Sequence, residues 1–303
     1  MEEDLRNLIK KFIEQQKTGM ASPLLVVLGP TASGKTALSI EIAQQFGGEI
    51  ISADSRQVYR HMNIGTDKIS VEARHGVPHH LLDVADPDER FTVADFKAQA
   101  EMAIDDILAR GKLPILTGGT GLYIRAITEN FDIPAENREV RAQLIEELEK
   151  IGPDALYEKL KKLDPGSAAK IHPKNPRYVV RALEICMTTG HPKSDAKKTP
   201  KYQCLQIGLS WPREALFERI HRRIDEQIEH GLIDETKQLL SLGYSKNLPS
   251  MNTLGYKEIV AHLDGMMTLA EATEELKQNT RNFAKRQMTW FKRDQGVIWI
   301  KAN

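Results

Sequence analysis

The stretch from Leu24 to Ala43, LLVVLGPTASGKTALSIEIA, constrains the fold more than any other part of the chain. A continuous apolar run is followed by a glycine-rich turn, and residues with helical periodicity begin at Lys35. The turn, residues 29–36, matches the phosphate-binding pattern G-x-x-x-x-G-K-[ST] in full. A loop of this kind between a buried strand and a helix predicts a parallel sheet whose ligands bind at the carboxyl ends of its strands.

Each residue type in this turn suits phosphate binding. Gly29 and Gly34 permit tight backbone turns, so that amide N–H groups and the helix N-terminus converge on phosphate oxygens. Lys35 adds a positive charge, and the hydroxyl of Thr36 can bind Mg²⁺. The pattern predicts a bound phosphate but does not specify a nucleoside triphosphate.

Further strands are expected on both sides of this loop in the sequence. Apolar runs at Glu49–Ala53 and Leu113–Thr117 are separated by a helical stretch at residues 92–111. The runs at Tyr202–Trp211 and Val297–Ile300 indicate a return to the sheet and a short closing strand. The predicted fold class is therefore α/β, with a parallel sheet core like that of the P-loop NTPases.

The texture of the chain indicates three further boundaries. Residues 1–20 form an amphipathic helical extension that is expected to end near Gly19 and to pack on its own domain. Residues 126–200 contain charged helices broken by Gly and Pro, with no convincing strand, and are read as a helical insertion. The α/β core is then residues 21–125 and 201–303.

Composition limits the partners and the compartment. Lys plus Arg and Asp plus Glu each number 42 in 303 residues, so a nucleic acid would have to be held by local basic patches. Cys186 and Cys204 lie in no metal-binding pattern, which fits a reducing compartment and no structural zinc. The N-terminal region has no apolar run long enough for a signal peptide or membrane span. We expect a cytoplasmic monomer that does not bind a membrane.

A carboxylate and a second glycine turn accompany the phosphate loop. Asp54 ends the apolar strand in IISADSRQ, where it could hold Mg²⁺ through water, act as a general base or cap the following turn. Gly118, Gly119 and Gly121 follow another strand, either as a flexible active-site turn or as a plain strand-to-helix turn. The chain has no clear run of four apolar residues that ends in Asp, the second nucleotide-binding motif usual in kinases.

Two basic helices are expected in the C-terminal part. In RIHRRIDEQIEHGL we expect two of Arg219, Arg222 and Arg223 to be solvated and one to point at a leaving phosphate. The stretch Leu276–Arg293 has six Lys or Arg residues and no acidic residue, and Arg281, Lys285 and Lys292 can share one helix face, as in helices that follow a phosphodiester backbone. Its aromatic residues are expected to be core rather than platforms for bases.

Several of these stretches occur together and in order. With GPTASGKT, ISADSRQVYR, MNIGTDK, VPHHLLDV, GGTGLYIRA, NPRYVVRALE and AKRQMTWFKR, the chain resembles the bacterial tRNA dimethylallyltransferases, from about Leu24 to about Trp299. The resemblance implies that the dimethylallyl group of dimethylallyl diphosphate is transferred to N6 of adenosine 37, beside the anticodon. The phosphate in the cradle is then part of a leaving group.

The resemblance also implies roles for single residues. Asp54 would take the proton from the adenine amine, while Arg223 and Thr31 act on the departing diphosphate, with Mg²⁺ at Thr36 as cofactor. The residues implied to bind the diphosphate are Gly29, Thr31, Ala32, Ser33, Gly34, Lys35 and Thr36.

The tRNA anticodon stem-loop is the implied macromolecular partner, with its target base flipped into a channel through the core. The residues implied to contact tRNA are Asp54, Ser55, Arg56, Gln57, Thr120, Arg177, Arg181, Arg281 and Lys285.

Other functions stay open on the sequence alone. An adenylate isopentenyltransferase would use free nucleotide and would not need the helical insertion or the basic C-terminal helix. A P-loop small-molecule kinase would turn over ATP, and a non-catalytic RNA-binding module would not need Lys35, Thr36 and Asp54 at these positions.

Overall fold

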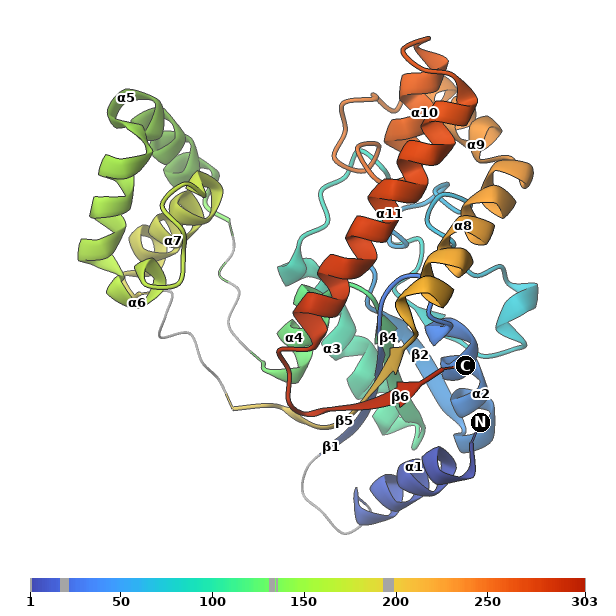
Figure 1. Ribbon diagram of the computed structural model, residues 1–303. Coiled ribbons are helices and arrows are strands. Elements are labelled where there is room, and N and C mark those ends of the chain that lie inside the picture. The colour runs from blue at the N-terminus through green and yellow to red at the C-terminus, as the bar shows by residue number, and fades with distance from the viewer. Residues whose placement is uncertain (1, 17–21, 131–133, 135, 193–198, 303) are drawn as a thin grey trace. The chain divides into compact units, whose positions relative to one another are not determined.

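The computed structural model describes residues 2–16, 22–130, 134, 136–192 and 199–302 (Figure 1). The chain divides into two compact units, residues 1–128 with 201–303, and residues 129–200. The predicted insertion boundary at residue 126 falls inside α4 (Gly121–Thr128), because the last turn of this helix buries Ile127 in the core of the first unit. The expected end of the N-terminal helix near Gly19 lies outside the described residues.

The first unit is built on a parallel six-stranded sheet with strand order β3-β2-β4-β1-β5-β6. The strands are β1 (Ser22–Leu28), β2 (Gly48–Ser52), β3 (His79–His80), β4 (Leu113–Gly118), β5 (Tyr202–Ser210) and β6 (Val297–Lys301). All five strands predicted from apolar runs are present with small shifts at their ends, and the predicted α/β class is confirmed. The two-residue β3 is too short to give a periodic signal.

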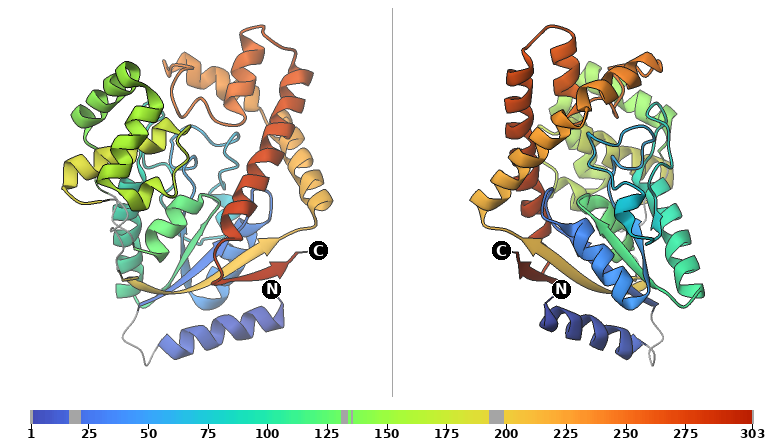
Figure 2. Two further views of the ribbon diagram at one scale, coloured as in Figure 1. Left: turned by 60° about the vertical axis from the view of Figure 1, so that its left-hand side comes forward. Right: turned by 90° about the vertical axis from the view of Figure 1, so that its right-hand side faces the viewer.

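Helices cover both faces of this sheet, because successive side chains of a strand point to opposite faces. Leu24 and Val26 of β1 pack in one hydrophobic cluster with α3 (Val93–Ala109) and α4. Leu25 and Val27 pack in a second cluster with α2 (Lys35–Phe46) and α1 (Glu3–Gln16) (Figure 2). The result is a three-layer α/β arrangement with the phosphate loop at the carboxyl end of β1.

Helix α1 uses its apolar face for this packing. Leu5, Ile9 and Phe12 are buried and belong to the same cluster as Leu25 and Val27. Among the helices of the described residues, none combines the length and the apolar character that crossing a bilayer requires.

Four helices of the C-terminal part form a third cluster beyond the carboxyl ends of the strands. They are α8 (Arg213–Glu229), α9 (Leu232–Ser241), α10 (Tyr256–Leu263) and α11 (Leu269–Phe291). α8 follows β5 in the chain, and α11 runs beside it, with an ion pair between the two helices that joins Lys277 Nζ to Asp225 Oδ1 at 2.8 Å (Figures 1 and 2). Both helices therefore border the edge of the sheet where ligands of parallel sheets bind.

The second unit has helices but no strand among its described residues. It consists of α5 (Arg138–Leu163), α6 (Pro165–Ala168) and α7 (Pro176–Thr189), with α5 kinked at Gly152, where φ is 80° and a proline follows. The buried carboxylate of Glu184 accepts hydrogen bonds from the Asn137 amide at 2.9 Å and from the guanidinium groups of Arg141 and Arg181. These contacts satisfy a charge that would otherwise be costly to bury.

Candidate active site

The backbone of the phosphate loop needs glycine at two positions. Gly29 has φ 151°, and a Cβ there would lie 2.9 Å from the carbonyl oxygen of Leu209. Gly34 has φ 91° and forms the N-cap of α2. Because both positions favour glycine, the loop can turn tightly into the N-terminus of α2, where unpaired amides and the helix dipole favour an anion.

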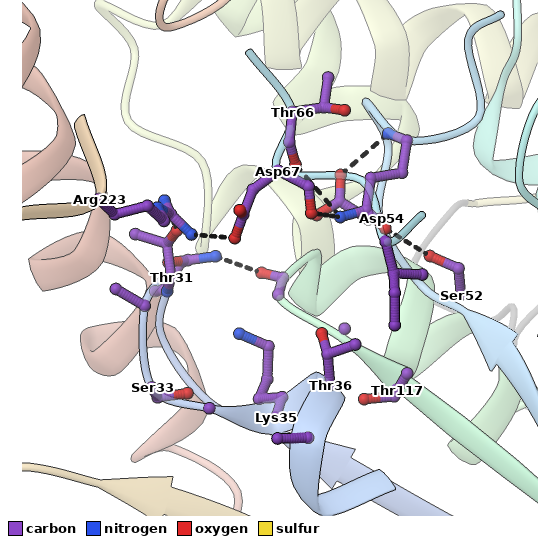
Figure 3. A pocket seen from close by; sticks show the side chains of 18 of the residues that line it. Thr31, Ser33, Lys35, Thr36, Ser52, Asp54, Thr66, Asp67, Thr117 and Arg223 are labelled. Atoms are coloured by element: carbon purple, nitrogen blue, oxygen red, sulfur yellow. Dashed lines mark hydrogen bonds and ion pairs between the residues drawn. The ribbon is translucent and has the colours of Figure 1, made fainter. Parts of the chain in front are cut away.

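A cavity of about 500 Å³ opens over this loop (Figure 3). Its walls come from the phosphate loop, the segments after β2 and β4, the loop before β3, and α8 and α11. The lining includes Thr31, Ala32, Ser33, Gly34, Lys35, Thr36, Asp54, Gln57, Thr66, Asp67, Thr117, Gly118, Gly119, Arg219, Arg222, Arg223, Phe283 and Gln287. The seven residues of the predicted diphosphate set thus lie in one place, six of them in the cavity lining and Gly29 beneath it.

Lys35 carries the charge that the loop pattern predicts. Its Nζ donates to the carbonyl oxygen of Pro30 at 2.7 Å, within the loop itself. Burial, with a smaller contribution from the nearby Arg223, lowers the pKa of Lys35 to about 8 against the opposite effect of Asp54 and Asp67. A bound phosphate would favour the protonated form of Lys35 and so raise the pKa of this lysine.

Arg223 of α8 connects the loop to the opposite wall. Its guanidinium donates to Thr31 Oγ1 and to Asp67 Oδ2, the latter at 2.9 Å (Figure 3). Because the hydroxyl of Thr31 accepts from Arg223, its own proton is available for a ligand in the cavity. Arg223 Nε and Ser33 Oγ are buried and have no hydrogen-bond partner among the described residues. A ligand with several acceptor oxygens fits these groups.

Arg219 and Arg222, the other two arginines considered as phosphate contacts on α8, have different surroundings. Arg219 donates to the carbonyl oxygen of Ala32 at 2.8 Å and stacks over the ring of Trp211 at 4.3 Å. Arg222 is 69% exposed and pairs with Glu226 at 3.8 Å. All three arginines line the cavity, but only Arg222 is exposed, so the expectation of two solvated side chains was wrong. Arg219 and Arg223 are four residues apart and share one helix face, from which both contact the phosphate loop. That one of them points at a leaving phosphate stays a prediction.

Asp54 lies two residues after the end of β2 and lines the cavity. Its Oδ1 accepts from the amides of Arg56 at 2.8 Å and Gln57 at 3.4 Å, so the carboxylate also caps the following turn. Its Oδ2 has no hydrogen bond within the described part of the chain. The capping role and a role toward a ligand are therefore compatible, because each uses a different oxygen.

The second glycine turn, residues 118–121, packs against the segment that follows β2. A Cβ on Gly118 would overlap the carbonyl group of Ala53, so only glycine permits this approach. The Thr120 amide donates to the Ala53 oxygen at 3.2 Å, and Thr120 Oγ1 accepts from the Ser55 amide at 3.0 Å. Ser55, Arg56 and Thr120 lie next to the cavity rather than in its lining. The turn fixes the position of Asp54 through its neighbours.

The basic residues of α11 gather around one aromatic ring. Arg281 and Lys285 both lie over Phe217 of α8, at 5.9 and 5.5 Å. Lys285 is exposed, whereas Arg281 also contacts His221. Of the aromatic residues on α11, Phe291 is buried as expected, but Trp290 is 37% exposed. This cationic face is open to solvent along α11.

The two arginines of the second unit have different surroundings. Arg177 is exposed near the start of α7. Arg181 donates to Glu184 Oε1 at 2.6 Å and to the carbonyl oxygen of Pro134 at 2.6 Å. Arg181 therefore contributes to the internal structure of this unit, and Arg177 is the one available to an external partner.

Sequence reasoning missed three residues that shape the cavity. Asp67 pairs with Arg223, and Gln287 of α11 donates to the Gly119 oxygen and accepts from the Thr31 amide. Glu235 of α9 accepts from the amides of residues 63–65 and from the Tyr256 hydroxyl, which holds the loop that carries Asp67. The partners of Gln287 and Glu235 are far away in the chain, so no local pattern could have identified them.

Comparison with known proteins shows which family the chain matches. The model of the family described as IPP transferase matches residues 57–294, and that of isopentenyl transferase matches residues 22–83. The chain is 47% identical to a tRNA dimethylallyltransferase of Geobacter metallireducens, over 95% of this chain and 94% of that protein. It is also 48% identical to a tRNA dimethylallyltransferase of Alkaliphilus metalliredigens, over 92% of each.

Solved structures agree with these relatives. A tRNA isopentenylpyrophosphate transferase from Bacillus halodurans is 46% identical, with a TM-score of 0.69 over 92% of this chain and 90% of that one. A eukaryotic dimethylallyltransferase acting on tRNA is 32% identical, with a TM-score of 0.81 over 93% of this chain and 74% of that one.

Proposed function

Because the chain belongs to the tRNA dimethylallyltransferase family, we propose that it transfers the dimethylallyl group from dimethylallyl diphosphate to N6 of adenosine 37 in tRNA. The family assignment confirms the resemblance inferred from the sequence. The observation that best supports the reaction is one cavity that combines the complete phosphate loop, Arg223 and the carboxylate of Asp54. The strand beside β1 in the sheet, β4, ends in Thr117–Gly118 rather than in an acidic residue, which disfavours a kinase.

The diphosphate end of the reaction needs stabilisation of growing negative charge. When the bond between the prenyl carbon and the diphosphate oxygen breaks, that oxygen takes the electron pair. Lys35, Arg223 and the loop amides supply positive charge and hydrogen-bond donors around this position, and the Thr31 hydroxyl can donate its free proton. These groups are fixed before the reaction, which is what makes such stabilisation effective.

The amine end needs removal of a proton. The lone pair of an exocyclic adenine amine is delocalised into the ring, so N6 is a poor nucleophile. As the N6–carbon bond forms, the nitrogen becomes acidic, and the Oδ2 atom of Asp54 can accept its proton. Asp54 is our proposed general base, with Oδ1 anchored by the turn amides.

Mg²⁺ fits the donors of this cavity. The side chain of Thr36 is exposed at the start of α2, and the carboxylates of Asp54 and Asp67 line the same space. Hard oxygen donors together with ligand phosphates and waters are the environment that Mg²⁺ prefers. We propose that Thr36 holds Mg²⁺ together with the substrate, where the ion neutralises charge on the leaving diphosphate.

We propose that tRNA enters with its target base flipped out of the anticodon loop, because N6 of a stacked base cannot reach Asp54. The base and its neighbours would meet the segment after Asp54 and the turn that contacts it, which contain Ser55, Arg56, Gln57 and Thr120. The phosphate backbone would be held by Arg281 and Lys285 of α11 and, in the second unit, by the exposed Arg177. Arg181, which the resemblance also implied, is instead paired inside that unit. A cytoplasmic, monomeric enzyme remains the prediction from sequence.

The decisive experiment incubates the protein with labelled dimethylallyl diphosphate and Mg²⁺ in three separate reactions. The first contains unmodified tRNA, the second contains AMP, and the third contains ATP without tRNA or AMP. We expect label in tRNA alone, and loss of this transfer on chelation of Mg²⁺. Label in AMP alone would indicate a free-nucleotide enzyme, and ATP turnover without transfer would indicate a kinase. Mapping the label to adenosine 37 tests the position.

A further inference from the structure

Gln287 connects helix α11 with the loop after β1 and the loop after β4. It lies on α11, is only 7% exposed, and has both ends of its amide paired. Its Oε1 accepts from the Thr31 amide at 2.8 Å, and its Nε2 donates to the Gly119 carbonyl oxygen at 2.9 Å. One side chain therefore bridges the loops that follow β1 and β4, and it does so from a helix of the C-terminal part.

The surrounding structure leaves this bridge little freedom. A Cβ on Gly119 would overlap Gln287 Nε2, so the glycine makes room for the amide. Ala284 and Phe291, on the turns before and after Gln287, are buried, so α11 is packed on both sides of the bridge. A movement of α11 at this level must move the hydrogen bond to Thr31 with it.

Thr31 is held at two points, and both contacts affect its hydroxyl. Gln287 fixes the Thr31 backbone, while Arg223 donates to its Oγ1. The direction of the remaining hydroxyl proton, which faces the diphosphate in our proposed function, depends on both contacts. Loss of the Gln287 contact leaves the Thr31 amide and the Gly119 oxygen without their partner, so both loops can relax.

The same helix carries the cations proposed to hold RNA. Lys285 lies two residues before Gln287 and is exposed, and Arg281 lies six residues before it. Since a helix transmits displacement along its length, RNA that fixes Lys285 and Arg281 also fixes the position of Gln287 and, through it, of Thr31.

We propose that Gln287 is a positioning residue that couples RNA binding on α11 to diphosphate binding in the phosphate loop. This inference rests on the proposed function. Bound RNA restrains α11, α11 restrains Thr31 through Gln287, and the ordered loop then binds diphosphate more tightly. By linkage, diphosphate tightens RNA binding by the same factor.

The test measures this coupling without turnover. Inorganic diphosphate with Mg²⁺ is titrated into the protein alone and into the protein saturated with an unmodified anticodon stem-loop RNA. For the unaltered protein we expect RNA to lower the Kd of diphosphate by roughly ten-fold, within the usual range for coupled sites. For Gln287→Met, which keeps the side-chain length but neither hydrogen bond, we expect less than about a two-fold effect.

The matched control is Thr273→Val on the same helix. Its hydroxyl donates only to the Leu269 carbonyl oxygen within α11, at 2.8 Å, so this variant should keep the full coupling. Should Gln287→Met fail to fold, Gln287→Asn, whose amide is one methylene shorter and cannot span both loops, takes its place.

Equal coupling in Gln287→Met and the unaltered protein would overturn the proposal, as would absence of coupling in the unaltered protein. Weaker diphosphate binding with unchanged coupling would make Gln287 a purely structural residue and would also overturn it. Transfer of label to tRNA by the unaltered protein tests the proposed function separately, so failure of one can be distinguished from failure of the other.

Discussion

The lowered pKa of Lys35 makes diphosphate binding depend on pH in a way that can be calculated. In the free protein, burial lowers this pKa to about 8, so about half of the molecules have a neutral Lys35 at pH 8. A diphosphate anion in the cavity favours the charged lysine and raises its pKa. Binding at pH 8 should therefore take up about half a proton at this residue, because only the protonated form matches the anion.

The affinity should follow the same titration. Above pH 8 the protein must first protonate Lys35, which weakens the apparent Kd by a factor of about 1 + 10^(pH − 8) while the pKa of the complex stays higher. The factor is about 2 at pH 8 and about 11 at pH 9, so the Kd should rise about five-fold over that interval. Below pH 7 the factor approaches one and this dependence disappears.

Calorimetry in two buffers with different protonation enthalpies measures the number of protons taken up. The control is Lys35→Arg, whose guanidinium remains charged throughout this range. The diphosphate and Mg²⁺ titrate equally in both experiments, so the difference in proton uptake isolates Lys35. Identical proton uptake by the two proteins at pH 8, or a Kd that changes equally between pH 8 and 9, would refute the assignment.

Three further changes test other parts of the molecule. Asp54→Asn should keep diphosphate and RNA binding but lower kcat about 10²- to 10⁴-fold, and rapid-quench transfer assays with unchanged kcat would contradict its role as base. Glu235→Ala removes an acceptor of backbone amides, so urea unfolding should show a loss of about 2–4 kcal/mol, and a loss near zero would show that the loop does not depend on it. Arg110 holds the pKa of the buried Glu49 well below its usual range, so this pair stabilises the protein above the unfolded pKa and loses that contribution in acid. The unfolding free energy of Glu49→Gln should accordingly be lower at pH 7 and converge with that of the unaltered protein as the pH falls below about 4, and a constant difference would contradict the linkage.

Local patterns predicted the parts of the site that are contiguous in the sequence. The phosphate loop is recognisable because its strand, turn and helix follow one another, and Asp54 because it ends an apolar run. Helical periodicity also places Arg219 and Arg223 on one face, because they are four residues apart, and both contact the phosphate loop.

The remaining residues lie outside the reach of such patterns. Gln287 meets Thr31 across 256 positions, and Glu235 meets Ile64 across 171. Each is a common polar residue on an amphipathic helix, where an exposed position is the usual interpretation. Only the packing of α9 and α11 makes Glu235 a half-buried partner of one loop and Gln287 a buried partner of two others.

The site thus combines residues that are contiguous in the sequence with residues from distant helices. This combination suggests how a common phosphate loop can serve one particular reaction. The phosphate loop supplies amides, Lys35 and Thr36, which would serve a kinase as well as a prenyl transferase. This site is distinguished by two side chains from α8 and α11 that hydrogen-bond to Thr31. Arg223 donates to the Thr31 hydroxyl, and Gln287 accepts from the Thr31 amide. The Thr31 amide of the loop is thus bonded to the protein itself, and in our proposed function the Thr31 hydroxyl beside it donates to the leaving oxygen. We therefore expect the choice of reaction to reside in the C-terminal helices, so that exchanging Gln287 or Arg223 lowers transfer of label to tRNA far more than it weakens binding of inorganic phosphate by the loop.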